Sequence, residues 1–127
     1  MSEQKPGEVL DAKYHVFRFS DIKPSFTPRG SSTHEQVGAR NGTSIAGGVV
    51  FFKDAEIPFT LWYDELLICH AVEESFHIVV DNQPRQLAPG DMIWLPAGTS
   101  LIYRSKGTAT AFWAVTPPDW ADRRPAS

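Results

Sequence analysis

The chain has 127 residues, of which 42% are apolar, 12% aromatic and 21% charged, and its formal net charge at pH 7 is -3. A chain of this length forms one domain that removes roughly two-thirds of its unfolded surface from water, so a hydrophobic core is expected. The slightly acidic balance provides no basic field for nucleic acid, which excludes DNA and RNA as expected partners.

Cysteine content and apolar runs indicate where the protein works. Cys69 is the single cysteine, which excludes an intrachain disulfide and a cysteine zinc cluster and fits a reducing compartment. The opening MSEQKPGEVLDA lacks the apolar region of a secretory signal, and no apolar run approaches the ~20 residues that a membrane-spanning helix needs. We therefore predict a cytoplasmic protein without a membrane partner.

The first third of the chain is predicted to hold little regular structure. Residues 1–12 are polar and are expected to form a flexible tail. YHVFRFS (14–20) alternates with period two and predicts a strand. Residues 23–42 carry prolines, glycines and small polar side chains without periodicity, which predicts a long loop of the kind that often covers a site.

From Thr43 onward the sequence consists of short strand-like runs separated by turn residues at roughly 8 to 12 residue intervals. No window holds the helical spacing of apolar residues. The pattern predicts an all-β sandwich or barrel, with the domain spanning residues 13–120 and a flexible tail over 121–127. The runs are SIAGGVVFF, PFTLWYDELLICHA, SFHIVV, RQLA, DMIWL, SLIYRS and TAFWAVT.

The segment APGDMIWLPAGTSLIY (88–103) resembles the second sequence motif of the cupins. In this motif Gly90 and Asp91 make one turn, and Pro96 and Gly98 make another. PFTLWYDE and the run through IVVDNQPRQLAPGD resemble the first cupin motif and the strand after it. The resemblance extends over about residues 44–120 and implies a cupin (RmlC-like) jelly-roll β-barrel in a single domain.

Four segments indicate which group of cupins the chain resembles most. AGGVVFF, WYDE, PGDMIWLPAGTSL and the closing VTPPDW are most similar to the ethanolamine-utilisation EutQ proteins and their short relatives. This resemblance implies a scaffold role in a catabolic assembly as one function. It offers no support for the acetate kinase activity proposed for EutQ, because the chain has no phosphate loop of the form GxxxxGK[ST].

The resemblance also bears on metal binding. Metal-binding cupins hold their ion with two histidines and a glutamate from the first motif and one histidine from the second. Here Leu101 stands at the second-motif position, and the first-motif histidine positions fall near Phe59 to Tyr63, where the sequence has no histidine. Only the glutamate is kept, as Glu65. We therefore expect no tightly held transition metal and no iron or manganese chemistry.

Strand alternation predicts what fills the cavity instead. If Glu65 points inward, Tyr63, Leu67 and Cys69 share its face, and Leu101 and Tyr103 point inward from the second motif. Trp113 or Phe112 is expected to line the cavity as well. We predict that Leu101, Trp113, Leu67 and Cys69 contact a ligand.

Among aromatic walls Glu65 loses hydration, so its pKa should rise and make it a general acid or base. Tyr63 or Tyr103 would donate a hydrogen bond to a substrate oxygen. The alternative is that Glu65 is a buried structural carboxylate.

Three histidines give weaker hypotheses. A hairpin about Glu73 and Glu74 would place His70 opposite His77 on one face. With Glu65 these are the candidates for a non-standard metal site, whereas surface or dimer-contact histidines are the commoner outcome. His34, in the predicted loop, is either a mobile acid or base at the cavity mouth or a solvated side chain.

The exposed aromatics predict a partner. Trp62 and Trp94 are expected on the face opposite Tyr63, and an exposed pair of indoles favours coverage by a second subunit, so we predict a homodimer. Trp120 is expected to anchor the C-terminal segment on the barrel. Three functions remain open for this small-molecule-binding cupin: a metal-independent or metal-poor isomerase, lyase or hydrolase, a metabolite-binding or sensing module, and a scaffold component.

Overall fold

The computed structural model describes residues 14–125, which form nine strands and three short 3-10 turns. The turns are η1 (Phe19–Asp21), η2 (Ala39–Asn41) and η3 (Trp120–Arg123). The strands are β1 (Ser31–Val37), β2 (Ala46–Lys53), β3 (Glu56–Thr60), β4 (Asp64–Val72), β5 (Ser75–Val80), β6 (Gln83–Gln86), β7 (Met92–Leu95), β8 (Ser100–Lys106) and β9 (Thr108–Thr116).

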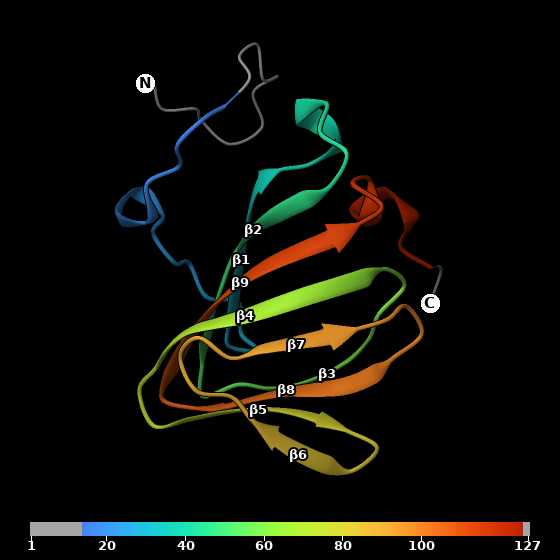
Figure 1. Cartoon of the computed structure of the whole chain (residues 1–127). Coiled ribbons are helices and arrows are strands. Elements are labelled where there is room, and N and C mark those ends of the chain that lie inside the picture. Colours follow the sequence, from blue (N-terminus) through green and yellow to red (C-terminus); the bar gives the residue numbers. More distant parts are fainter. Residues whose placement is uncertain (1–13, 126–127) are drawn as a thin grey trace.

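The strands form two antiparallel sheets that face each other (Figure 1). The larger sheet has the order β1-β2-β9-β4-β7 and the smaller one the order β3-β8-β5-β6. From β2 onward nearly every connection carries the chain from one sheet to the other, because only β5 and β6 are consecutive neighbours. This is the predicted all-β jelly roll, and its core lies between the sheets.

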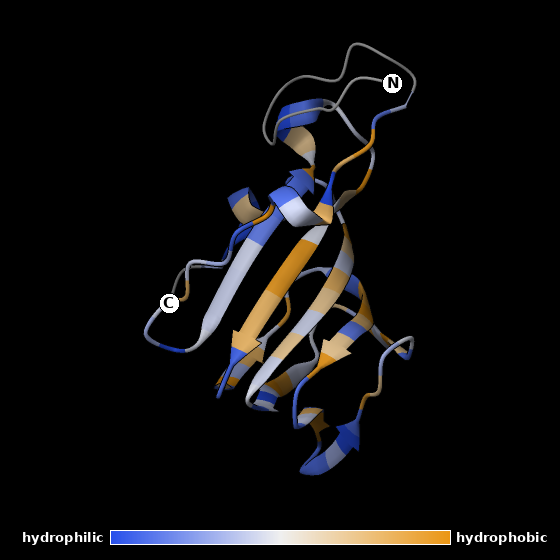
Figure 2. Ribbon diagram, turned by 90° about the vertical axis from the view of Figure 1, so that its left-hand side faces the viewer, coloured by the Kyte–Doolittle hydropathy of each residue, from blue (hydrophilic) through white to orange (hydrophobic). Residues whose placement is uncertain are grey.

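Alternation within the strands produces this core. In β4 the residues Glu65, Leu67 and Cys69 are buried while their neighbours are partly exposed. In β5, Phe76 and Ile78 are fully buried. Figure 2 shows the most hydrophobic residues on central strands, whereas some edge strands are mostly hydrophilic. The two inner faces therefore meet in an apolar layer.

The turns of the cupin motif are confirmed. Gly90 and Gly98 both have positive φ, at 93° and 92°, which a glycine adopts without strain. The Asp91 N–H donates to the Ala88 carbonyl at 2.9 Å and the Gly98 N–H donates to the Leu61 carbonyl at 2.8 Å. The second bond ties the turn before β8 to the segment before β4, and so brings the two motifs together.

Two predictions for the N-terminal third are wrong. Residues 14–20 form no strand, because only Val16 makes a single bridge before η1 begins. Phe19 packs instead on the outer face of the larger sheet, 5.8 Å from Phe51 and 6.0 Å from Phe112 between ring centroids. The long loop predicted over residues 23–42 contains β1. This edge strand is polar, so apolar alternation did not reveal it.

The hairpin about Glu73 and Glu74 is also wrong. β4 pairs with β7 and β9, whereas β5 pairs with β6 and β8, so the chain crosses between sheets at these glutamates. The Glu73 carboxylate accepts a hydrogen bond from the Thr108 N–H at 3.0 Å at this corner. His70 and His77 consequently lie on different sheets and do not face each other.

The predicted limits of the domain stay a prediction. The tail expected over residues 1–12 lies outside the described residues, and of the tail expected over 121–127 the structure describes residues to 125. Within residues 14–125 there is no helix that combines the length and the hydrophobicity needed to cross a membrane.

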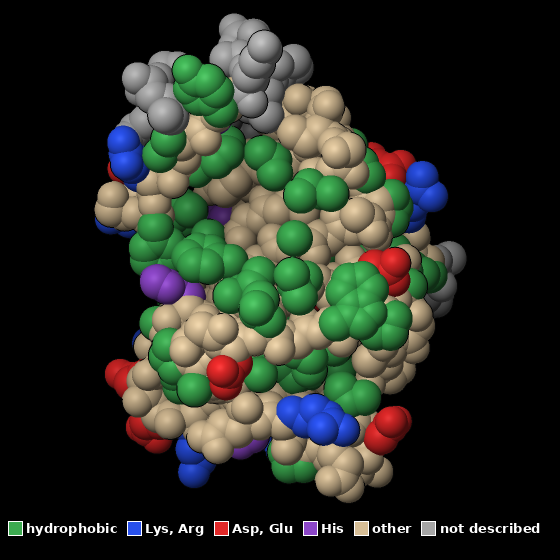
Figure 3. All heavy atoms as spheres, in the orientation of Figure 1, with side chains coloured by type: hydrophobic (Ala, Val, Ile, Leu, Met, Phe, Trp, Pro, Cys, Tyr) green, Lys and Arg blue, Asp and Glu red, His purple; other side chains and the backbone are tan. Residues whose placement is uncertain are grey.

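The outer face of the larger sheet carries exposed apolar side chains. Met92 and Trp94 of β7 are 62% and 59% exposed, and they lie beside Ile68 and Leu66 of β4. Figure 3 shows hydrophobic side chains gathered across the middle of this view. Trp62 does not join them as predicted, because its indole N–H donates to the Trp120 carbonyl at 2.6 Å and the ring is partly buried. One exposed indole therefore remains.

We expect this face to pair with a second copy of the chain, because apolar patches of this kind are commonly covered by a partner. Sedimentation velocity at micromolar concentration should show a dimer, and Trp94→Glu, which places a charge in the patch, should give a monomer. Arg85→Glu on β6 of the smaller sheet is the matched control and should remain dimeric. A monomeric wild-type protein would contradict the prediction.

Candidate functional site

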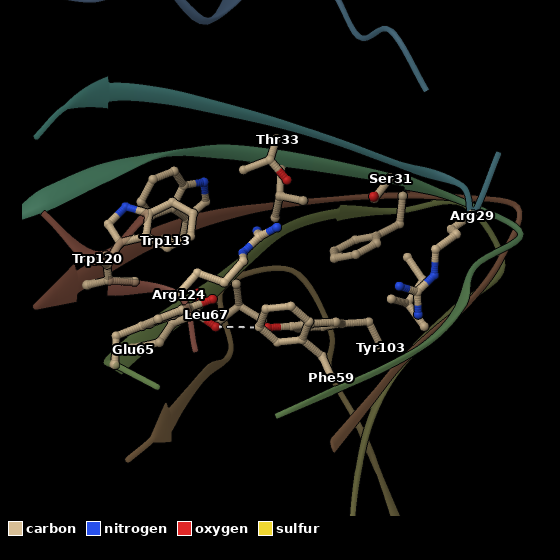
Figure 4. A pocket seen from close by; sticks show the side chains of 15 residues that line it. Arg29, Ser31, Thr33, Phe59, Glu65, Leu67, Tyr103, Trp113, Trp120 and Arg124 are labelled. Carbon is tan, nitrogen blue, oxygen red and sulfur yellow. Dashed lines mark hydrogen bonds between the residues drawn. The ribbon is translucent and has the colours of Figure 1, made fainter. Parts of the chain in front are cut away.

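A cavity of about 280 Å³ lies inside the barrel between the two sheets. Its size is close to the lower limit for small-molecule sites, and its walls are mostly apolar with a few polar groups, as such sites usually are. Figure 4 shows these side chains converging on one space. The lining residues are Arg29, Ser31, Thr33, Val50, Phe52, Ile57, Phe59, Tyr63, Glu65, Leu67, Tyr103, Trp113, Val115, Trp120 and Arg124.

Glu65 is the one carboxyl group in this lining. Its strand, β4, lies between β9 and β7, and the residue is only 5% exposed. The Tyr103 hydroxyl donates a hydrogen bond to Glu65 Oε1 at 3.2 Å (Figure 4). Loss of hydration raises the pKa of Glu65 to about 7, and the bond from Tyr103 opposes this rise only in part. Near neutral pH the carboxyl group is therefore present in both protonation states.

Two phenols flank this carboxyl group. Burial and the nearby Glu65 raise the pKa of both Tyr63 and Tyr103, so both hydroxyls stay protonated and able to donate. The Tyr103 ring stacks on Phe52 with a centroid distance of 5.3 Å, which fixes its orientation. The Tyr63 ring packs against Trp62 and Trp120 at 5.1 and 5.0 Å. A buried acid with two hydrogen-bond donors results.

Two arginines contribute positive charge to the cavity. Arg29, before β1, donates from Nη2 to the Pro58 carbonyl at 3.2 Å. The Arg124 guanidinium, which follows η3, lies 5.3 Å from the centre of the Trp62 ring, within cation–π range. Neither arginine was predicted as a site residue, since both lie outside the strands, where no periodicity indicates a direction. The available signal was a basic side chain within the predicted loop over residues 23–42 and another after VTPPDW.

Trp120 fixes the segment that carries Arg124. Its indole N–H donates to Glu35 Oε1 at 2.9 Å, and its carbonyl accepts the bond from Trp62. A third bond, from the Ala39 N–H to the Pro118 carbonyl at 3.2 Å, holds the same segment. Trp120 thus anchors the C-terminal segment on the barrel, as predicted, and also lines the cavity.

The structure brings together five of the seven predicted site residues: Tyr63, Glu65, Leu67, Tyr103 and Trp113 all line the cavity. Leu101 and Cys69, expected to contact a ligand, are buried in the core but do not line it. Strand alternation predicts the face of a side chain and not whether that side chain borders open space. The ligand contacts themselves stay a prediction.

The other predicted positions lie elsewhere. Phe112, the alternative to Trp113, packs on the outer face against Phe19 and His70. His34 belongs to β1, where Nε2 lies 2.8 Å from Ser32 Oγ and the ring meets Phe51 edge-on. It is therefore neither a mobile acid or base at the mouth nor part of the cavity lining.

The residues present do not fit a transition metal. Across residues 14–125, no three histidine, cysteine, aspartate or glutamate side chains are placed to hold an ion together. The candidates for a non-standard site are far from one another in the fold. Glu65 lines the cavity, His70 belongs to β4 of the larger sheet without lining the cavity, and His77 belongs to β5 of the smaller sheet. Phenols and guanidiniums around a single carboxyl are a poor ligand set for borderline divalent ions. No step of the chemistry is therefore assigned to a metal.

Comparison with known proteins gives matches over most of the chain. The profile of the family described as "Ethanolamine utilisation protein EutQ" matches residues 16–122. Among curated proteins, "Acetate kinase EutQ" of Salmonella typhimurium is 25% identical over 114 residues, which cover 89% of this chain and 47% of that protein. The chain spans less than half the length of the curated relatives it matches.

Solved structures agree on the fold. The EutQ protein of Clostridium difficile matches with a TM-score of 0.73 at 19% identity, covering 86% of this chain and 84% of that one. A Cupin 2 conserved barrel domain protein of Salinispora arenicola matches with a TM-score of 0.63 at 11% identity, covering 88% and 96%. The predicted cupin jelly roll is confirmed.

The raised pKa of Glu65 predicts a pH dependence of stability. Because folding raises this pKa from 4.5 to about 7, the contribution of the group is fully present below pH 4.5 and is lost as the pH rises through 7. Glu65→Gln cannot ionise. The free energy of unfolding of the wild type should therefore fall relative to that of Glu65→Gln, by roughly 3 kcal/mol between acidic and mildly alkaline pH.

Urea unfolding of both proteins across this pH range measures the difference. Glu74→Gln, at an exposed carboxylate outside the cavity, serves as the control and should show no comparable trend. A difference between wild type and Glu65→Gln that stays constant with pH would show that Glu65 ionises as it does in the unfolded chain.

Elemental analysis of the purified protein tests the expected absence of a metal. Because the cavity offers one carboxyl group and no imidazole, we expect transition metals far below a stoichiometric amount and no change in melting temperature with chelator. A stoichiometric ion that a chelator removes with loss of stability would contradict this and would return Glu65, His70 and His77 to consideration as ligands.

Proposed function

The chain belongs to the ethanolamine utilisation protein EutQ family, and from that premise we propose that its cavity binds a small polar metabolite and transfers a proton on it without a transition metal. The reaction class is isomerisation, elimination or hydrolysis. Glu65 is the general acid or base, and the two tyrosines are the hydrogen-bond donors. The protein is expected to work in the cytoplasm, as its single cysteine favours.

The main support for this proposal is the raised pKa of Glu65. A general acid or base works best when its pKa lies near the working pH, and burial brings the pKa of this carboxyl to about 7. An ordinary exposed glutamate would be fully ionised there. The cavity beside it has room for a ligand and mostly apolar walls, which supports proton transfer to a bound molecule.

The two tyrosines have different roles in this proposal. Tyr103 already donates to Glu65 at 3.2 Å, so it orients the carboxyl group and supports its ionised form. Tyr63 lines the same cavity and also keeps its proton because burial and Glu65 raise its pKa. Tyr63 is therefore the better donor to a substrate carbonyl or enolate oxygen, where charge develops during proton transfer.

Phosphoryl transfer is not part of the proposal. The Salmonella relative is named an acetate kinase, but this chain covers 47% of that protein and has no GxxxxGK[ST] loop. A metabolite-binding or sensing module remains the second candidate, because the bond from Tyr103 also suits a purely structural carboxylate. A scaffold role in a catabolic assembly would not explain the presence of the cavity.

Glu65→Gln separates catalysis from binding. The change keeps the shape of the side chain and removes proton transfer, which is typically worth ~100-fold to 10,000-fold in rate. We expect the wild type to accelerate hydrogen–deuterium exchange next to the carbonyl in a panel of keto acids and small sugars, as followed by NMR in deuterium oxide. Glu65→Gln should lose this activity while its melting temperature still rises with the same ligands.

Glu74→Gln is again the matched control and should retain exchange. A wild-type protein that binds members of the panel without accelerating exchange would reject the enzyme and leave the binding module. Native mass spectrometry of the freshly purified protein, which identifies a metabolite that co-purifies, supplies the substrate for the same measurement.

A further inference from the structure

We propose that the ligand of the cavity is a small organic acid whose carboxylate binds the Arg124 guanidinium, with its hydrocarbon part on the apolar wall and a second oxygen near Tyr63. This inference rests on the proposed binding function and adds to it the chemical class of the ligand. It follows from the charges, the free donors and the volume of the cavity.

The ionisable lining has an excess of positive charge. Arg29 and Arg124 contribute two guanidiniums, and Glu65 is the one acidic group against them. Arginine remains protonated at any physiological pH, whereas the buried carboxyl is only partly ionised near neutrality. A cavity of this composition favours an anion over a neutral or cationic guest.

Among residues 14–125, no carboxylate lies within ion-pair distance of either cavity arginine. Within residues 14–125 the arginines in ion pairs with identified acidic partners are Arg40, Arg104 and Arg123. Arg29 is bonded to a backbone carbonyl, and Arg124 rests on the face of Trp62. Contact with an aromatic face leaves the N–H groups at the edge of the guanidinium plane free to donate, and their fork geometry matches a carboxylate.

Arg124 is the better placed of the two. In Figure 4 its guanidinium reaches over the middle of the cavity, between Trp113 on one side and Tyr103 on the other, whereas Arg29 lies at the far end. Arg124 is close enough to oppose the rise in the pKa of Tyr63. A carboxylate bound to Arg124 would therefore hold its neighbouring carbon atoms beside Tyr63 and Glu65.

Trp113 forms part of the apolar wall. The residue is 5% exposed and lines the cavity, but its indole Nε1 atom is shielded from the open space, so the ring offers packing surface to a ligand and not a hydrogen-bond donor. The hydroxyls of Ser31 and Thr33 line the same side of the cavity, as Figure 4 shows, and can take a further polar substituent.

The volume limits the ligand. About 280 Å³ lies near the lower limit of small-molecule sites, which favours a small metabolite over a large ligand. The apolar part of the wall, formed by side chains such as Phe52, Ile57 and Phe59, suits a short carbon chain better than a fully hydroxylated sugar.

Matched acids and amides test this inference. The probes are the straight-chain 2-oxo acids from three to six carbons and the corresponding 2-oxo amides, which keep the shape and remove the charge. Ligand-observed NMR titration of the wild type should detect saturable binding of the acids and much weaker binding of the amides. Arg124→Gln should weaken acid binding roughly 10- to 100-fold, as expected for loss of a charge-assisted contact.

Arg123→Gln is the matched control. Arg123 is the sequence neighbour of Arg124, but its guanidinium pairs with Asp119 at 2.8 Å and does not line the cavity. It should bind the acids like the wild type, and Arg124→Lys should recover part of the affinity. Melting temperatures confirm that each variant is folded. Amides that bind as tightly as acids, acids that do not bind, or unchanged binding in Arg124→Gln would each overturn the inference.

The outcomes also separate this inference from proton transfer by Glu65. Acid binding that depends on Arg124 in a protein that catalyses no exchange supports the ligand class and rejects the enzyme. Exchange that is lost in Glu65→Gln and unaffected by Arg124→Gln supports the enzyme and rejects the carboxylate contact.

Discussion

Burial of the Glu65 carboxyl group between the two sheets is the constraint on which the site depends. Two effects compete at this group: loss of hydration favours the neutral acid, and the bond from Tyr103 favours the carboxylate. Loss of hydration is the larger, so the pKa rises. This requires that β4 keep its register against β9 and β7, where Glu65 pairs with Val115 and Leu95. A slip of one residue would turn Glu65 outward and place Asp64 or Leu66 in the cavity.

Closure of the cavity relies on segments outside the sheets. Trp120 couples the last turn to the barrel through its bonds with Glu35 and Trp62, and this places Arg124 four residues later over the open space. On the opposite side β1 brings Ser31 and Thr33 to the lining. Backbones approach closely there, since a Cβ at Gly48 of β2 would collide with the His34 carbonyl oxygen. Both arginines and the hydroxyls of Ser31 and Thr33 thus come from β1, the segment just before it and the segment after β9.

Periodic strand patterns in the sequence predicted the inward-facing side chains, whereas the segments without periodicity were not predicted. Alternation along the runs that became β4 and β8 predicted that Tyr63, Glu65, Leu67 and Tyr103 point inward, because side chains of a strand alternate regardless of its neighbours. It predicted the same of Cys69 and Leu101, but not that these two leave the cavity lining. The polar edge strand β1 has no apolar alternation, and the crossing at Glu73 looks locally like a hairpin. Arg29 and Arg124 reach the cavity only through tertiary contacts such as those of Trp120.

If Glu65 transfers a proton as proposed, the charges of the site indicate which way the proton moves first. Glu65, with a pKa of about 7, is divided between acid and carboxylate near neutral pH. An organic anion held at Arg124 adds a negative charge near this group and offsets the guanidinium, and both changes disfavour ionisation of Glu65. The complex would therefore begin with Glu65 protonated and Tyr63 as a second donor. Such an arrangement favours initial protonation of the substrate, with Glu65 acting first as the acid and then, as carboxylate supported by Tyr103, as the base.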